Sequence, residues 1–322
     1  MSRPRILNAE PDRYSARARA ALEAVGDVTE EALDREGLLK AIPAYDALIV
    51  RLGHRVDTAL LDVAPRLKVI ATATTGLDHI DLKTCKERGV EVLSLRGENE
   101  FLRGVVATAE HTWALLLALI RRIPAASAAV ARGEWDRDAF RGRELEGKRL
   151  GILGLGRIGE RVARYGQAFG MEVRGYDRYR ETWPEDLIRM PTLDTLLETS
   201  DVLTLHVPSN EDTKGMIGRR QLSRLPAGAI VVNTSRGAVL EGDALLDFIR
   251  SGRLAGAAVD VIEGETGPGG VATDPLVVAA RELEQVLVTP HIGGATSESM
   301  EKTEVFMARK LAGFLVGQGK PA

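Results

Sequence analysis

"GILGLGRIGERVA", residues 151–163, decides the fold. It lies between an apolar run at 149–153, typical of a buried strand, and a helical pattern that follows it. Between the two, Gly154, Gly156 and Gly159 have the spacing G-x-G-x-x-G. At a strand-to-helix turn, such glycines permit a tight turn, the approach of a pyrophosphate to the backbone, and close packing of helix on strand. The stretch predicts a dinucleotide site at a helix N-terminus.

The next predicted strand, 172–176, is followed by an acidic residue, Asp177. A carboxylate at this place accepts hydrogen bonds from the adenosine ribose and repels a 2′-phosphate, so we expect NAD rather than NADP. Arg178, the next residue, counts slightly against that choice. The alternative is a glycine turn in some other α/β protein, with Asp177 as a surface charge.

Strand and helix patterns alternate along most of the chain, which predicts parallel sheets with helices on both faces. One series of strands is expected at 5–9, 46–50, 68–72 and 90–94, and a second at 149–153, 172–176, 201–206, 229–233, 256–260 and 286–289. A buried helix is expected at 105–123, a loop at 263–275 and a tail helix at 297–317. The fold class is therefore α/β with doubly wound sheets, and 322 residues allow two domains.

Composition excludes several classes of function. A net charge of -3 provides no electrostatic surface for nucleic acid or an anionic membrane. The single cysteine, Cys85, forms no intramolecular disulfide, and no metal-ligand pattern surrounds it, so no metal is expected. The most apolar run, 113–120, is too short to span a bilayer, and the N-terminus lacks the apolar core of a signal peptide. We expect a cytoplasmic protein.

Three segments that follow later strands carry polar side chains suited to chemistry. Arg236 follows the strand at 229–233, Asp260 ends the strand at 256–260, and His291 follows the strand at 286–289. Glu263 and Glu265 lie in the loop beyond Asp260. Because ligands bind at the carboxyl ends of strands in open α/β sheets, these groups are expected to converge.

This set of side chains fits hydride transfer to a 2-oxo acid. The planar fork of Arg236 can hold the substrate and polarise its carbonyl. An imidazole titrates near neutral pH, so His291 can supply the proton that the new hydroxyl needs. Glu265 beside it would favour the charged imidazolium. The structural alternative is that His291 is an ordinary turn histidine.

The stretches "PRLKVIATATTGLDHIDL", "TAEHTWALLLAL", "GILGLGRIG", "NTSRGAVL" and "TPHIGG" resemble the D-isomer-specific 2-hydroxyacid dehydrogenase family, in the family's order and over nearly the whole chain. The resemblance implies that Arg236 is the substrate arginine, Glu265 the acid and His291 the general acid/base. It also implies that backbone amides around Thr75–Leu77 (Thr75, Gly76 and Leu77) hold the substrate carboxylate. Asp260 would contact the nicotinamide carboxamide.

The resemblance also implies an architecture and a set of contacts. A Rossmann NAD-binding domain, 101–294, would be inserted in a flavodoxin-like substrate domain made of 1–100 and 295–322. The protein would be a homodimer acting on a small 2-hydroxy or 2-oxo acid. The expected cofactor contacts are Gly154, Gly156, Arg157, Ile158, Gly159, Asp177, His206, Pro208, Thr234 and Asp260.

Some alternatives stay open. Glu265 is followed by Thr266 where the family often has proline, so Glu263 is a second candidate for the acid. Arg51 could reach an anionic substituent on the substrate or be a solvated charge at a strand end. His111 is expected to be a satisfied core or interface histidine. The alternative functions are a glyoxylate or hydroxypyruvate reductase within the family, and an NAD(H)-sensing corepressor-like binding protein.

Overall fold

The computed structural model describes residues 3–265 and 271–317. The chain divides into two compact units, unit 1 with Met1–Val105 and Ala295–Ala322, and unit 2 with Val106–Gly294. The expected boundary at 100/101 falls inside helix α5 (Asn99–Leu102). Leu102 and Val105 are buried in the core of unit 1, which is why the chain leaves that unit later than we expected.

Unit 1 contains a five-stranded sheet in the order β2-β1-β3-β4-β5, with all neighbours parallel. Its strands are β1 (Arg5–Asn8), β2 (Asp27–Glu30), β3 (Ala47–Val50), β4 (Val69–Thr72) and β5 (Glu91–Leu93). This is the flavodoxin-like strand order, so the predicted fold class of this part is confirmed. Strand β2, which the sequence did not predict, has no fully buried residue and is mostly polar.

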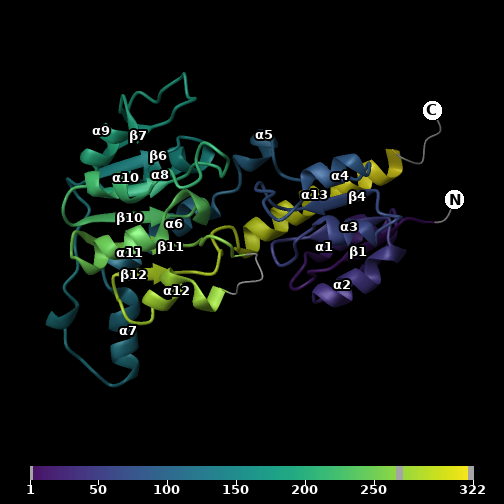
Figure 1. Ribbon diagram of the computed structural model, residues 1–322, viewed down its shortest axis with the longest axis horizontal. Coiled ribbons are helices and arrows are strands. Elements are labelled where there is room, and N and C mark those ends of the chain that lie inside the picture. Colours follow the sequence, from purple (N-terminus) through teal and green to yellow (C-terminus); the bar gives the residue numbers. More distant parts are fainter. Residues whose placement is uncertain (1–2, 266–270, 318–322) are drawn as a thin grey trace. The chain divides into compact units, whose positions relative to one another are not determined.

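Helices cover both faces of this sheet. They are α1 (Ala16–Glu23), α2 (Arg35–Ala41), α3 (Thr58–Asp62), α4 (Leu82–Glu87), α5 and α13 (Ser297–Gly317). Side chains of α2, α3 and α4 share one core with the sheet, and those of α1 and α13 share the other. Helix α13, drawn in yellow, thus packs beside elements from the opposite end of the chain (Figure 1).

Unit 2 contains a seven-stranded parallel sheet in the order β12-β11-β10-β9-β6-β7-β8. Its strands are β6 (Arg149–Leu153), β7 (Glu172–Tyr176), β8 (Ile188–Arg189), β9 (Val202–Leu205), β10 (Ala229–Asn233), β11 (Leu254–Val259) and β12 (Val286–Val288). The strand order reverses between β6 and β9, the switch point at which doubly wound sheets bind dinucleotides. The six predicted strands are present, and the two-residue β8 is additional.

The helices of unit 2 also form two layers. They are α6 (Ala107–Ile120), α7 (Ile123–Ala131), α8 (Arg157–Ala168), α9 (Leu193–Glu198), α10 (Arg219–Arg224), α11 (Gly242–Arg250) and α12 (Pro275–Ala279). Helices α6 and α8 pack on one face, and α9 to α12 on the other. Most of these elements appear in teal and green in Figure 1.

The single helix expected at 105–123 is broken near its end. Helix α6 ends at Ile120, Arg122 adopts a left-handed backbone conformation with φ 54°, and α7 begins at Ile123. Pro124 explains the break, because it lacks the N–H that a continuous helix would bond to the carbonyl of Ile120, whereas proline is tolerated in the first turn of a new helix. Within the described residues, no single helix is long and apolar enough to cross a membrane. The segments Asn99–Ile120 and Ile123–Ala131 meet that criterion only together, across a bend of 63°.

The loop expected at 263–275 is only partly within the described residues, because 266–270 lie outside them. A short 3₁₀ turn covers Val271–Thr273, and α12 begins at Pro275. The tail helix expected at 297–317 is confirmed as α13.

Candidate active site

The glycine motif joins β6 to α8 in the geometry that a dinucleotide site requires. Gly154 has φ 91°, and a Cβ atom there would lie 2.9 Å from the backbone of His206. A Cβ on Gly159 would lie 2.1 Å from the carbonyl oxygen of Gly154, so neither position accepts a side chain. Gly156 is the N-cap of α8, and nothing lies within 4 Å of its Cβ position. That open space beside a helix N-terminus fits a pyrophosphate.

Asp177 follows β7 at the same edge of the sheet, where Leu153 of β6 pairs with Tyr176. One carboxylate oxygen accepts the backbone N–H of Leu155 at 2.8 Å, and the other accepts that of Tyr179 at 2.9 Å. These bonds fix the carboxylate next to the glycine loop. It keeps further lone pairs with which to accept ribose hydroxyls.

His206 follows β9 on the other side of the switch point. Both of its ring nitrogens are buried and have no hydrogen-bond partner among residues 3–265 and 271–317. Burial lowers the pKa of His206 to about 3, so the ring is neutral at physiological pH. Buried polar atoms are rarely left unpaired in proteins, so an unpaired ring beside the glycine loop fits a missing ligand.

The other expected cofactor residues are near the same strand ends. The carbonyl of Pro208 accepts a hydrogen bond from Thr213 at 2.6 Å, and the hydroxyl of Thr234 lies 2.8 Å from that of Thr112. Arg157 and Ile158 form the first turn of α8. Burial, together with the nearby charge of Arg161, lowers the pKa of Arg157.

His291 and Glu265 are in direct contact. Nδ1 of His291 lies 2.5 Å from Oε1 of Glu265, and both side chains are about a quarter exposed, at 25% and 23%. Glu265, not Glu263, therefore holds the histidine. The backbone of His291 has φ 53°, a left-handed conformation that is uncommon in residues other than glycine. This geometry leaves Nε2 on the opposite side of the ring, where no described residue bonds to it.

Asp260 organises the loop that carries His291. Its Oδ1 accepts hydrogen bonds from the Thr289 hydroxyl at 2.6 Å and the Ile292 backbone at 2.9 Å, and its Oδ2 accepts one from the Gly293 backbone at 2.7 Å. The carbonyl oxygen of Asp260 also accepts the backbone N–H of His291 at 2.8 Å. The family resemblance implied a nicotinamide contact for Asp260, whereas these hydrogen bonds were not predicted from the sequence.

His111 of α6 completes the same network. Its Nε2 lies 3.1 Å from Oδ1 of Asp260 and 3.0 Å from the hydroxyl of Thr289, so it is a satisfied histidine. Burial alone would raise the pKa of Asp260. The hydrogen bonds from His111, Thr289 and the loop backbone outweigh it and keep that pKa below its ordinary value. The carboxylate is therefore ionised and fixed in place at neutral pH.

Arg236 lies at the end of β10, the neighbour of β11. Asn233 shapes its turn by donating to the carbonyl oxygen of Arg236 at 2.9 Å and accepting the N–H and hydroxyl of Ser235. Gly237 packs so tightly that a Cβ there would lie 1.9 Å from the carbonyl carbon of Ile262. Arg236, Asp260 and His291 thus emerge from adjacent strands at one edge of the sheet.

In unit 1 the segment Thr75–Leu77 follows β4 as a loop. Among the residues that the structure describes, none accepts a hydrogen bond from the backbone N–H of Thr75, Gly76 or Leu77. The hydroxyl of Thr74 bonds to the carbonyl of Gly76 at 2.7 Å and stabilises the turn. Three unpaired N–H groups in one turn suit an anionic ligand such as a carboxylate.

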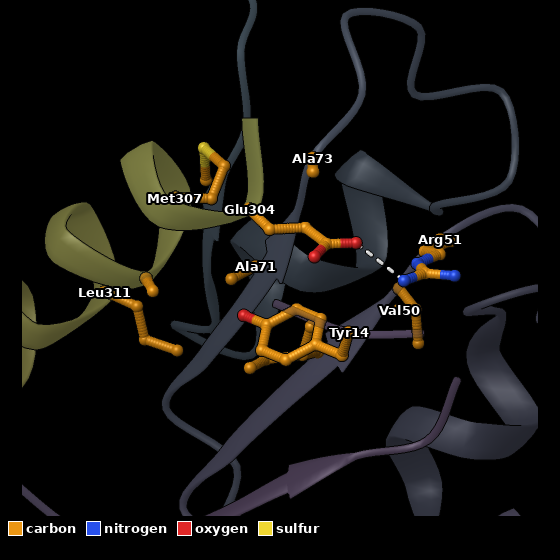
Figure 2. A pocket seen from close by; sticks show the side chains of 10 residues that line it. Tyr14, Val50, Arg51, Ala71, Ala73, Glu304, Met307 and Leu311 are labelled. Atoms are coloured by element: carbon orange, nitrogen blue, oxygen red, sulfur yellow. Dashed lines mark hydrogen bonds and ion pairs between the residues drawn. The ribbon is translucent and has the colours of Figure 1, made fainter. Parts of the chain in front are cut away.

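Arg51 is not a solvated strand-end charge. Its Nη2 lies 2.6 Å from Oε1 of Glu304 on α13, and Figure 2 shows the two side chains directed toward each other. The side chain of Arg51 is 23% exposed and that of Glu304 only 2%. This ion pair was not predicted from the sequence.

Residues 113–293 match the family described as "D-isomer specific 2-hydroxyacid dehydrogenase, NAD binding domain". The chain belongs to the D-isomer specific 2-hydroxyacid dehydrogenase family. The matched segment covers most of unit 2, so unit 2 is the NAD-binding domain of this dehydrogenase family.

Relatives within the dehydrogenase family differ in name and length. A hydroxypyruvate reductase of Thermotoga maritima is 37% identical over 88% of this chain and 90% of that protein. A glyoxylate reductase of Thermococcus litoralis is 38% identical over 88% of this chain and 85% of that protein. A D-3-phosphoglycerate dehydrogenase of Archaeoglobus fulgidus is 37% identical over 88% of this chain but only 52% of its own length. The chain thus spans about half of that last relative.

A solved structure supports the same fold. The crystal structure of a D-lactate dehydrogenase from Aquifex aeolicus, complexed with NAD and lactic acid, is similar with a TM-score of 0.82 and 30% identity. The match covers 97% of this chain and 96% of that one. In the described part of this dehydrogenase family member, no group of three or more His, Cys, Asp or Glu side chains could hold a metal ion.

Proposed function

We propose that the chain is an NAD-dependent oxidoreductase that interconverts a D-2-hydroxy acid and the corresponding 2-oxo acid. One observation carries the proposal: Nδ1 of His291 lies 2.5 Å from Oε1 of Glu265 at the strand ends of an NAD-binding domain. A histidine held by a carboxylate at this edge is suited to proton transfer.

His291 would act through Nε2. Reduction of the carbonyl leaves an oxygen at C2 that needs a proton, and oxidation of the hydroxyl releases one. Glu265 accepts the hydrogen bond of Nδ1–H, which fixes the orientation of the ring. The proton would then leave from, or return to, the nitrogen on the opposite side of the ring.

Arg236 and the loop Thr75–Leu77 would position the substrate. The guanidinium of Arg236 offers a planar fork of donors for a carboxylate or a carbonyl oxygen. The three unpaired backbone N–H groups of the loop can hold the substrate carboxylate without adding a side-chain charge.

The proposed cofactor contacts are those of the glycine loop and its neighbours. Bound NADH would supply the hydride. Gly154, Gly156 and Gly159 leave room for the pyrophosphate, and Asp177 would accept the ribose hydroxyls and disfavour NADPH. His206 has two ring nitrogens for which a bound nucleotide could provide partners.

Asp260 would act mainly as an organising group. Four donors already bond to its carboxylate, three at Oδ1 and one at Oδ2. Oδ2 keeps one lone pair that could accept a nicotinamide carboxamide, and that expected contact stays a prediction. Its fixed carboxylate instead supports the loop that presents His291.

The test is NADH oxidation by the purified protein with glyoxylate, hydroxypyruvate, 3-phosphohydroxypyruvate, pyruvate and 2-oxoglutarate, with NADPH in parallel. We expect turnover of at least one 2-oxo acid with NADH preferred. Tight NADH binding without turnover of any of them would contradict the proposal and favour the NAD(H)-sensing alternative.

Matched variants separate the two loop carboxylates. Glu265→Gln removes the charge beside His291 and is expected to lower kcat by about 10²-fold or more. Glu263→Gln makes the same chemical change two residues earlier on an exposed side chain and should leave kcat close to wild type. Equal losses in both variants would argue against the role of Glu265.

Within the family, a glyoxylate or hydroxypyruvate reductase is the second candidate. The relatives of similar length at 37% and 38% identity have those names, and 90% and 85% of their lengths are matched. A clear kcat/KM preference for glyoxylate or hydroxypyruvate in the same panel would select this narrower activity.

A homodimer joined through unit 2 is also proposed. Helix α7 and the segment after it expose Ile123 at 56%, Val130 at 52% and Trp135 at 88%. Such apolar side chains are typical of a surface that another protein covers. Light scattering should give twice the mass of the 34.8 kDa chain, and Trp135→Glu should shift it toward the monomer. A cytoplasmic location stays a prediction from the sequence.

A further inference from the structure

Arg51 lies at the same edge of the unit 1 sheet as the loop that is proposed to hold the substrate carboxylate. It directly follows β3, and Val50 of that strand pairs with Thr72 of β4. Strand β4 leads into Thr75–Leu77, the loop proposed to hold the substrate carboxylate. Because β3 and β4 are parallel neighbours, the segments that follow their carboxyl ends lie at one edge of one sheet.

The guanidinium of Arg51 is already engaged within unit 1. Its Nη2 donates to Oε1 of Glu304 at 2.6 Å, and its Nη1 donates to the carbonyl oxygen of Asp12 at 3.0 Å. Figure 2 shows the pair beside a small pocket that Tyr14 and Met307 also line. The arginine thus faces a buried carboxylate.

Glu304 holds Arg51 strongly, because it has few other ways to stabilise its charge. Its second oxygen accepts the backbone N–H of Ser15 at 2.7 Å. Burial raises the pKa of Glu304 and outweighs the opposing effects of Ser15 and Arg51. If a substrate anion drew the guanidinium away, the buried carboxylate of Glu304 would remain without a compensating charge. Separating a buried ion pair in this way has a high cost in free energy.

A second carboxylate lies at the same strand end. Glu10 accepts the backbone N–H of Arg51 at 2.6 Å through one oxygen and that of Gly53 at 2.9 Å through the other. Glu10 and Glu304 together carry more negative charge than Arg51 can compensate. Their field opposes a phosphate placed near this strand end.

We propose that Glu304 is a positioning residue that keeps Arg51 away from the substrate, so that the protein selects 2-oxo acids with an uncharged substituent over phosphorylated ones. This inference rests on the proposed function and names the substrate class of that site.

The test compares kcat/KM for hydroxypyruvate and for 3-phosphohydroxypyruvate in the full-length protein with NADH. For the wild type, we expect hydroxypyruvate to be preferred by about tenfold or more. Glu304→Gln keeps a polar side chain of the same shape but removes the charge that holds Arg51. In this variant the relative kcat/KM of the phosphorylated substrate should rise by about tenfold.

The matched control is Glu301→Gln, which removes the same charge one turn earlier on α13. Glu301 is 49% exposed and pairs with Arg17 at 3.3 Å, so this change should leave the substrate ratio unaltered. The double variant Arg51→Gln/Glu304→Gln removes both charges together. It should keep the wild-type ratio, because Arg51 makes no contact with the phosphorylated substrate in the wild type.

Three results would overturn the inference. They are a wild-type preference for 3-phosphohydroxypyruvate, an unchanged ratio in folded Glu304→Gln, and a selective loss of the phosphorylated substrate in the double variant. If Glu304→Gln alone does not fold, the substrate ratios of the wild type and of the double variant still test the inference. Absence of turnover with every 2-oxo acid would instead refute the proposed function, and this inference with it.

Discussion

Replacing Asp260 with asparagine should destabilise unit 2 by about 3 kcal/mol. The carboxylate accepts four hydrogen bonds, three at Oδ1 and one at Oδ2. An asparagine can place its oxygen at the Oδ1 position, but its NH₂ group then faces the N–H of Gly293. One charge-assisted bond of about 1.5–3 kcal/mol is lost, the other three weaken, and relief of the buried charge offsets part of this loss.

The pH dependence of this effect follows from the direction of the pKa shift. The pKa of Asp260 is lower in the folded protein than in the unfolded chain. Its stabilisation is therefore complete above the unfolded carboxyl pKa of about 3.9 and is lost as the pH falls through the folded value. The stability difference between wild type and Asp260→Asn should be constant from about pH 8 to 5 and should narrow at lower pH.

Tryptophan fluorescence during urea unfolding measures this difference, because all three tryptophans lie in unit 2. Asp138→Asn is the matched control. It removes a carboxylate that is 61% exposed and should change the free energy of unfolding by less than about 0.5 kcal/mol. The reasoning would be refuted if Asp260→Asn lowered the free energy of unfolding by less than about 1 kcal/mol. It would also be refuted if the difference in stability from the wild type became larger at low pH.

Four further substitutions have expected outcomes. Gly237→Ala should lower the free energy of unfolding by more than about 2 kcal/mol, because its Cβ would lie 1.9 Å from the Ile262 backbone. Gly313→Ala, in an open part of α13, should raise the free energy of unfolding by up to about 1 kcal/mol. Thermal unfolding measures both changes. Asp177→Asn should raise the NADPH to NADH ratio of kcat/KM by about tenfold, and an unchanged ratio would contradict its ribose role. Arg236→Lys should lower kcat/KM by about 10²-fold, because an ammonium cannot reproduce the fork; near wild-type kinetics would exclude Arg236 from substrate binding.

The features that the sequence predicted well have local signals. The glycine motif spans six residues, and its turn, its helix and the following strand lie where the pattern indicated. Helix α13 has the predicted bounds, because its apolar spacing repeats over 21 residues. Strand β2 was missed because "DVTE" carries one apolar side chain, and β8 because two residues give no period.

The features that the sequence missed join distant residues. His111 meets Asp260 across 149 positions, and Arg51 meets Glu304 across 253. Periodicity indicates which face of an element is buried, but not which side chain on another element it contacts. A histidine in the apolar helix α6 did indicate a satisfied polar group, since buried polar atoms need partners. Nothing in the local pattern identified Asp260 as that partner.

The central claim is that His291 carries the proton, and His291→Asn tests it most directly. Asparagine tolerates the left-handed backbone, at φ 53°, that this position requires. The measurement is kcat with the best 2-oxo acid, together with the NADH dissociation constant from fluorescence titration. We expect kcat to fall by about 10³-fold while NADH binding stays within about twofold of wild type. Turnover close to wild type, or an equal loss of NADH binding, would contradict the account.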